Sequence, residues 1–388
     1  MDQISGRTFL SFSLLDSLYW AFYAAFAGYI TTYLLSCGMS SAVLSLTLAA
    51  FMGMSFIGSF FWGSRCDKAG TNRKIFIPEF AAAILVAMAI YFLAEKNYMI
   101  SALLYPLFGF LSAPLGSNLD SWMLRSFNRS AAVYGRARAV GSAGYAVAML
   151  VCGQLITVFG YMVIPAASLF FAAIVLLIAF LTREEPYENI RSRAGGSPKD
   201  LLKIRPYMYM IIILFLSGLA ISPINNLKIV ILESVGGDVS NLGMDAFAGV
   251  MLQACLLFIS GSLRRLPPYV RLFLASLCTL ITAVLTFLAV NPLMIILGTV
   301  MNNIGYGLLL PTMRQITEST VSGTLKNTAH AMCDATFGSF AGIIALLYSG
   351  SLMDAFGARS AALLGSFIMI IPVIMSLVSM IIEAKKSV

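Results

Sequence analysis

The sequence predicts an all-α, polytopic membrane protein with 12 transmembrane helices. Of its 388 residues, 59% are hydrophobic and only 11% are charged, whereas about a quarter of the residues in a soluble domain carry charge. A helix that crosses a bilayer needs about 20 apolar residues, and apolar stretches of that length recur along the whole chain. This composition argues against a cytosolic enzyme, a disordered chain or a secreted disulfide scaffold.

Polar breaks divide the chain into apolar segments, each of which is expected to form one membrane helix. The first segment is too long for the apolar core of a signal peptide, and no small-residue cleavage site follows it, so we expect it to remain as a span. The segments are 9–35, 41–62, 75–94, 98–124, 134–159, 162–182, 207–233, 243–262, 269–290, 292–316, 325–350 and 359–382.

Basic residues alternate between the two sides of these segments. Most of the 25 Lys and Arg residues lie at the N-terminus, in the loops after every second segment, and at the C-terminus. Because basic loops stay in the cytoplasm, we predict a multi-pass protein of the cell membrane with both termini cytoplasmic. The basic residues behind the net charge of +8 lie mostly in these cytoplasmic loops, so they do not indicate a nucleic-acid partner. We expect a monomer surrounded by membrane lipid.

A charged loop at 183–206 separates two sets of six segments. It contains Gly195-Gly-Ser-Pro198, a composition typical of a linker. Landmarks recur in both sets, since Gly63-Ser64 and Gly261-Ser262 each end the second segment of their set. We therefore predict a six-helix N-terminal bundle, a cytoplasmic linker and a six-helix C-terminal bundle, at 1–182, 183–206 and 207–388.

The loop after the second segment reads Gly63-Ser-Arg-Cys-Asp67-Lys68-Ala-Gly70-Thr-Asn-Arg73. Its glycines permit a tight turn, and its aspartate can accept hydrogen bonds at the start of a helix. This spacing, within two six-helix repeats, resembles the major facilitator superfamily of transporters. The resemblance implies the fold of that superfamily, with Gly63, Asp67, Lys68, Gly70 and Arg73 in a gating loop. The alternative is a loop that is basic only because it faces the cytoplasm.

The fifth segment begins Tyr134-Gly-Arg-Ala-Arg138-x-x-Gly141-x-x-Gly144-Tyr145, which resembles the lactose permease branch of oligosaccharide/proton symporters. The resemblance implies that Asp120 and Arg138 bind the sugar and that Tyr145 lies against its ring. Independently, Asp120 and Arg138 are equally distant from the middle of the turn between two antiparallel helices, which places them at one depth. The alternative is an ion pair that only joins two helices.

Other polar side chains inside the segments are candidates because charge at membrane depth costs at least a few kcal/mol. Asp16 shares one helix face with Phe12, Tyr19, Tyr23 and Phe26. It is a candidate proton carrier or a polar group in a ring-lined solute cavity, and the alternative is a hydrogen bond to a neighbouring helix. Neutral candidates that could contact a hydroxylated solute, or one another, are Asn225, Asn226, Asn302 and Asn303.

The eleventh segment contains the one histidine of the chain, His330, four residues before Asp334. Residues at that spacing lie one above the other on a helix, so the two are candidates for proton coupling. Lys228 is a candidate partner, unless its side chain extends to the outer surface. The tenth segment lacks the His/Glu cluster of the lactose permease branch, so lactose itself is not implied.

These observations predict a secondary transporter that moves a small polar solute, a sugar or glycoside, with protons by alternating access. No ATP-binding G-x-x-x-x-G-K-[ST] sequence occurs, so we expect an ion gradient to supply the energy and no cofactor. The alternative is a proton-coupled exporter of drugs or metabolites with the same fold, although the fifth segment lacks the proline of the exporter signature. A membrane enzyme or sensor is a remote alternative, because no catalytic constellation is visible.

Overall fold

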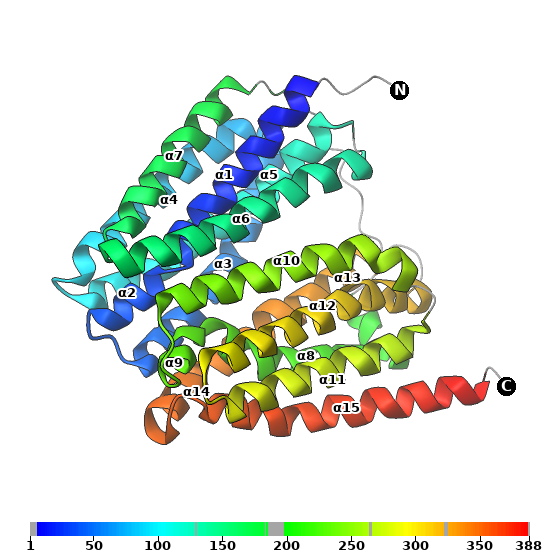
Figure 1. Ribbon diagram of the computed structural model, residues 1–388. Helices are drawn as coiled ribbons and strands as arrows, with labels where there is room; N and C mark the ends of the chain where they lie inside the picture. The colour runs from blue at the N-terminus through cyan, green and yellow to red at the C-terminus, as the bar shows by residue number, and fades with distance from the viewer. Residues whose placement is uncertain are drawn as a thin grey trace. The chain divides into compact units, whose positions relative to one another are not determined.

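The computed structural model describes residues 6–128, 130–182, 184, 198–263, 266–321 and 325–386, and their regular structure is helical (Figure 1). In this part of the chain, 11 helical stretches are long and apolar enough to cross a membrane. The prediction of an all-α polytopic membrane protein is thereby confirmed. The predicted span 243–262 lies in α10, some of whose side chains fall outside the description, so the count of 12 stays a prediction.

Contacts within the chain divide it into two compact units. The first comprises Met1–Arg191 with Asp238–Phe247, and the second comprises Ser192–Gly237 with Ala248–Val388. Most of the predicted linker at 183–206 lies outside the described residues. The bundle boundaries that the sequence suggests therefore stay predictions.

The first unit contains seven complete helices. They are α1 (Gly6–Ala27), α2 (Ile30–Ser36), α3 (Ser41–Ala69), α4 (Arg73–Ala94), α5 (Tyr98–Ser126), α6 (Ala131–Phe159) and α7 (Val163–Leu181). In this unit α1 packs against α6 and α7, while α5 packs against α3 and α4. Its core is rich in fully buried aromatic side chains, among them Phe12, Phe22, Phe76, Phe80 and Trp122.

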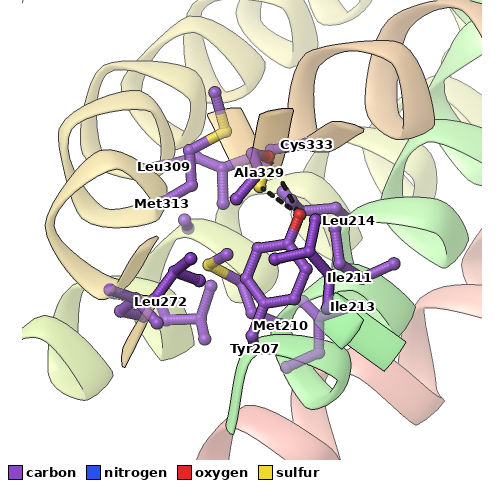
Figure 2. Packing of buried hydrophobic residues seen from close by; sticks show 14 of the residues in the cluster. Tyr207, Met210, Ile211, Ile213, Leu214, Leu272, Leu309, Met313, Ala329 and Cys333 are labelled. Carbon is purple, nitrogen blue, oxygen red and sulfur yellow. Dashed lines mark hydrogen bonds between the residues drawn. The ribbon is translucent and has the colours of Figure 1, made fainter. Parts of the chain in front are cut away.

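The remaining helices belong to the second unit, except that α10 begins in the first unit and enters the second at Ala248. They are η1 (Pro198–Lys203), α8 (Arg205–Asn226), α9 (Lys228–Glu233), α10 (Val239–Leu263), α11 (Pro268–Leu288), α12 (Pro292–Thr320), α13 (Lys326–Asp334), η3 (Ala335–Phe340), α14 (Ala341–Phe356) and α15 (Ser360–Lys386). Buried residues of α8, α11, α12 and α13 surround Tyr207, whose hydroxyl donates to the carbonyl of Ala329 at 2.9 Å (Figure 2).

Two predicted spans are each divided into two helices. The first divides at Gly28, where a Cβ would lie 2.4 Å from Sδ of Met149, so the chain passes α6 too closely for a side chain. The seventh divides at Leu227, directly after Asn226, whose side-chain amide donates to the carbonyl of Ser222 at 2.9 Å. A side chain that takes the carbonyl of residue i−4 competes with the helical hydrogen bond, but Asn303 makes the same bond within the continuous helix α12, so this bond alone does not explain the helix end.

The eleventh predicted span, 325–350, extends farther than expected, to Phe356. It contains η3, a π-helical stretch that begins directly after Asp334. One inserted residue per π turn widens a helix locally, and such turns are frequent at functional sites.

Candidate functional site

Three helices of the first unit bring one arginine between two carboxylates. Arg138 of α6 places Nη1 3.2 Å from Oδ2 of Asp16 on α1, and its Nε lies 3.6 Å from Oδ1 of Asp120 on α5. The predicted proximity of Asp120 and Arg138 is thus observed. The sequence did not indicate that Asp16, on the first helix, joins them.

The two carboxylates differ in their exposure. The side chain of Asp16 is 1% exposed, whereas those of Asp120 and Arg138 are 33% and 30% exposed. Tyr134, one helical turn before Arg138, lies within electrostatic range of the Asp120 carboxylate. Asp16 is therefore an internal anchor for the guanidinium, and Asp120 with the outer edge of Arg138 forms the accessible part of the cluster.

Two glycines of the α6 motif make this arrangement sterically feasible. A Cβ on Gly141 would lie 1.8 Å from Oδ2 of Asp16, and one on Gly144 would lie 2.1 Å from Oγ of Ser17. A Cβ at Gly141 would displace the carboxylate of Asp16, and one at Gly144 would also meet the backbone of Ser17 and so push α1 away from α6. The glycine spacing in the sequence thus has a direct role, because it lets the carboxylate of Asp16 reach Arg138.

Aromatic rings surround the guanidinium. Cζ of Arg138 lies 4.6 Å from the centre of the Trp20 ring, in a cation–π contact. The Trp20 ring in turn contacts Tyr145 at 6.3 Å and Tyr23 at 5.7 Å between ring centres. Tyr19 is buried beside Trp20, and its hydroxyl donates to the carbonyl of Ser112 at 3.2 Å. We did not select Trp20 from the sequence, although its position four residues after Asp16 would have placed it on the same helix face.

In the second unit the charged residues pair differently from our expectation. Asp334 of α13 accepts two hydrogen bonds from Nη2 of Arg314 on α12, at 2.9 and 2.7 Å. His330 lies 2.9 Å from Oε1 of Glu318, which also accepts from Lys326 at 2.6 Å. The side chains of Asp334 and His330, which the spacing places on one helix face, are therefore each bonded to a residue of α12 rather than to one another.

Other predicted contact residues of the second unit are engaged within their own neighbourhood. Lys228 is 8% exposed and donates to Oγ1 of Thr299 at 2.7 Å, so it is buried rather than extended to a surface. Asn226 and Asn303 donate to carbonyls one turn earlier in their own helices. Asn225 is exposed and Asn302 is partly exposed.

The predicted gating loop is mostly helical, which corrects our expectation of a tight turn at Gly63. Helix α3 runs through Gly63 and Lys68 to Ala69, and the chain turns at Gly70, whose φ of 60° suits glycine. The side chain of Asp67 lies outside the described residues. The start of α4 is capped by another carboxylate, that of Glu184.

Glu184 accepts hydrogen bonds from the backbone N–H groups of Asn72 and Arg73, at 2.9 and 2.8 Å, and from the Thr71 hydroxyl at 2.5 Å. A carboxylate at a helix N-terminus satisfies unpaired N–H groups and the positive end of the helix dipole. The Arg73 guanidinium extends the other way, to the carbonyls of Ala179 and Phe180 at the end of α7. We refer to Thr71, Asn72, Arg73 and Glu184 as the α4–α7 clamp.

One buried carboxylate escaped the sequence analysis altogether. Glu79 of α4 is 1% exposed and accepts a hydrogen bond from Nδ2 of Asn118 at 3.2 Å. A signal for it was available, because an acidic residue within an apolar segment is unusual at membrane depth. Asp245 of α10 is a second buried acidic residue that the same signal would have found.

Comparison with known proteins places this chain among membrane transporters. The family model described as "MFS_1 like family" matches residues 9–364. A maltose permease of Geobacillus stearothermophilus is 25% identical over 300 residues, which cover 76% of this chain and 74% of the permease.

Solved structures of transporters share the fold. A mutant of the nucleoside transporter NupG superposes with a TM-score of 0.83 at 12% identity, covering 96% of this chain and 99% of that one. A POT family peptide transporter gives a TM-score of 0.73 at 12% identity, with 96% of each chain covered. A bacterial metal transporter gives 0.71 at 13% identity, covering 96% of this chain and 99% of the other. At these identities the similarity shows the fold alone.

Proposed function

We propose that this chain, which belongs to the MFS_1 like family and is a transporter of the major facilitator type, moves a sugar or a glycoside together with protons. The observation that carries the proposal is Arg138, held between Asp16 and Asp120 beside the ring of Trp20. The similarity to a maltose permease supports a sugar as the solute.

The cluster suits a hydroxylated ring chemically. A planar guanidinium offers a rigid fork of donors, and a neighbouring carboxylate offers acceptors, so adjacent hydroxyl groups can be bound from both sides. The rings of Trp20 and Tyr145 provide apolar faces of the kind that pack against the C–H face of a sugar. Asp120 is the contact carboxylate in this proposal, because it is accessible while Asp16 is not.

Further parts of the proposal concern energy and placement. A proton gradient drives transport without a cofactor, and the protein works as a monomer in the cell membrane with cytoplasmic termini. Asp334 and His330 remain proposed coupling residues, acting through Arg314 and Glu318, their partners on α12. Tyr19, Tyr23, Lys228 and the four asparagines named above remain proposed solute or coupling contacts.

Transport into proteoliposomes tests the proposal. Proteoliposomes that contain the purified protein and are loaded with maltose should exchange it for external labelled maltose. An inward proton gradient should drive accumulation of maltose above its equilibrium concentration. The unfolding temperature of the purified protein, measured with sugars, nucleosides or aromatic acids, shows which class of solute binds. A ligand of the folded state raises the stability of that state.

The variant Arg138→Lys gives the specific control. An ammonium group keeps the charge but cannot form the planar fork, so exchange should be lost while the protein still inserts. Retained maltose exchange in Arg138→Lys would remove the cluster from the binding site. Stabilisation by nucleosides or aromatic acids but no sugar would contradict the proposed solute class.

A further inference from the structure

Glu79 is held in the first unit in an environment that does not suit a permanent negative charge. It lies six residues after Arg73, about 9 Å along α4, and its neighbours Phe76 and Phe80 on the same helix are fully buried, with their rings stacked on each other. Its Oε2 accepts from Asn118, and its Oε1, also buried, has no hydrogen-bond partner among the described residues. An ionised carboxylate away from water is costly unless it is paired or fully hydrogen-bonded.

Among the residues that the structure describes, no positively charged group is in direct contact with Glu79. Helix α5 presents the Asn118 amide, and α7 carries no titratable residue. From α1 the Tyr19 hydroxyl lies within electrostatic range of Glu79. The titratable residues of α3 are confined to its last turns, from Arg65 to Lys68.

A chain of hydrogen bonds nevertheless connects Glu79 to a cation. Asn118 donates to Glu79, its backbone carbonyl accepts from Nδ2 of Asn72 at 2.7 Å, and Oδ1 of Asn72 accepts from the Arg125 guanidinium. The Asn118 amide stabilises the ionised form of Glu79 directly, and the bonds from Asn72 and Arg125 hold the backbone of Asn118 and the side chain of Asn72 in place. Asn72 also belongs to the α4–α7 clamp, because its N–H donates to Glu184.

From this geometry we infer that Glu79 is a proton-binding site inside the first unit, whose occupancy is linked through Asn118 and Asn72 to the α4–α7 clamp. The protonated acid is neutral, so it needs no cation nearby and tolerates burial with Oε1 lacking a hydrogen-bond partner among the described residues. The ionised acid depends on the hydrogen bond from the Asn118 amide. Asn118 is in turn held through its backbone carbonyl by Asn72 at the start of α4, and Asn72 is held by Arg125. The consequence for transport rests on the proposed proton-driven function, whereas the proton site itself does not.

Infrared difference spectroscopy of the purified full chain tests the site directly. A protonated carboxyl group has a C=O stretch that disappears on ionisation. We expect the wild-type protein to lose such a band on titration to alkaline pH, and Glu79→Gln to lack this band. Glu95→Gln is the matched control, because Glu95 follows the same helix at its exposed end and its replacement should leave the band unchanged.

A second variant tests the link and does not alter the carboxyl group. In Asn118→Ala the band should persist to higher pH and shift to higher frequency, because the carboxyl group loses its one donor. Absence of the band from the wild type, or its presence in Glu79→Gln, would overturn the proton site. An unshifted titration in Asn118→Ala would show that the Asn118 amide does not stabilise ionised Glu79. The variant Asn72→Ala removes the side chain that joins Asn118 to the clamp and keeps the backbone N–H that Glu184 accepts from, so an unshifted titration in Asn72→Ala would overturn the link to the clamp.

The transport assay distinguishes this inference from the proposed function. In proteoliposomes, Glu79→Gln should lose proton-driven maltose accumulation and retain maltose exchange. Accumulation by Glu79→Gln at the wild-type level would refute a role in coupling. A wild-type protein that transports no maltose would instead contradict the proposed solute, and the infrared result would still decide the proton site.

Discussion

Asp16 and Asp120 contact the same guanidinium with different consequences. Asp16 is fully buried, so its interaction with Arg138 fixes the position of the guanidinium in the bundle. Asp120 is partly accessible, and Oδ1 lies 3.6 Å from Nε of Arg138, beyond hydrogen-bond distance. A solute hydroxyl can therefore insert between Asp120 and Arg138 without breaking the anchor that Asp16 provides.

This difference predicts opposite effects of two matched substitutions. Asp120→Asn should lower sugar affinity by about 2 kcal/mol, as for other close charged contacts, with little effect on the unfolding temperature. Asp16→Asn should lower stability by about 1–3 kcal/mol, because a buried partner of Arg138 is weakened. Thermal unfolding with and without maltose measures both quantities. Equal effects of the two variants on stability and affinity would contradict the separation of roles.

Only part of the cluster around Arg138 could be predicted from the sequence. Asp120 and Arg138 could be placed together because they lie on consecutive antiparallel helices, where distance from the turn sets depth. Asp16 and Trp20 could not be assigned to the same cluster, since they come from α1, and only tertiary packing brings α1 against α6. Likewise, the spacing of His330 and Asp334 indicated one helix face but not which neighbouring helix that face meets.

At the scale of the element, the packing of α1 on α6 depends on two glycines. The variant Gly141→Ala should destabilise the protein by about 1–3 kcal/mol through overpacking and should weaken maltose binding, because its Cβ would displace Asp16. Gly135→Ala is the matched control on the same helix. A Cβ there meets nothing within 4 Å, so this change should be neutral or slightly stabilising. Similar unfolding temperatures for both variants would show that α1 can move without cost.

Helices α12 and α13 carry complementary charges at matching positions. Arg314 and Glu318 lie one turn apart on α12, opposite Asp334 and His330 on α13. These side chains are partly exposed, so each pair contributes modestly to stability. The sequence distance from Arg314 to Asp334 resembles that from Asp120 to Arg138, but the acidic and basic residues exchange helices between the two units.

If the Arg314–Asp334 pair participates in coupling, both partners should be needed. We expect Asp334→Asn and Arg314→Gln each to abolish proton-driven accumulation of maltose and to preserve exchange, while changing the unfolding temperature only slightly. Ser319→Ala is the control, because Ser319 is exposed on α12 and its hydroxyl donates to the carbonyl of Ile316 in its own helix. Should the two variants accumulate maltose normally, the pair would only join the helices.

On the scale of the whole molecule, hydropathy predicted most of the fold, because each span must be long and apolar to cross a bilayer. The division of the first and seventh spans into α1 with α2 and α8 with α9 was not predictable from hydropathy. The first division depends on the close approach of Gly28 to Met149, a tertiary contact that hydropathy does not report. The two divisions occur at corresponding places in the two sets of helices, which agrees with the internal repeat seen in the sequence.

Orientation in the membrane is the property of the whole chain that charge predicts most directly. Basic residues cluster in the loops after the even-numbered spans, and such loops stay in the cytoplasm. A reporter fused after Gly195 or at the C-terminus should therefore be active only in the cytoplasm, and a reporter fused at Asp238 only outside. Because Asp238 follows the seventh span, its side of the membrane depends on whether α8 and α9 cross together as one unit. A cytoplasmic signal at Asp238 would mean that they do not, and that the even number of spans required by two cytoplasmic termini must be found elsewhere.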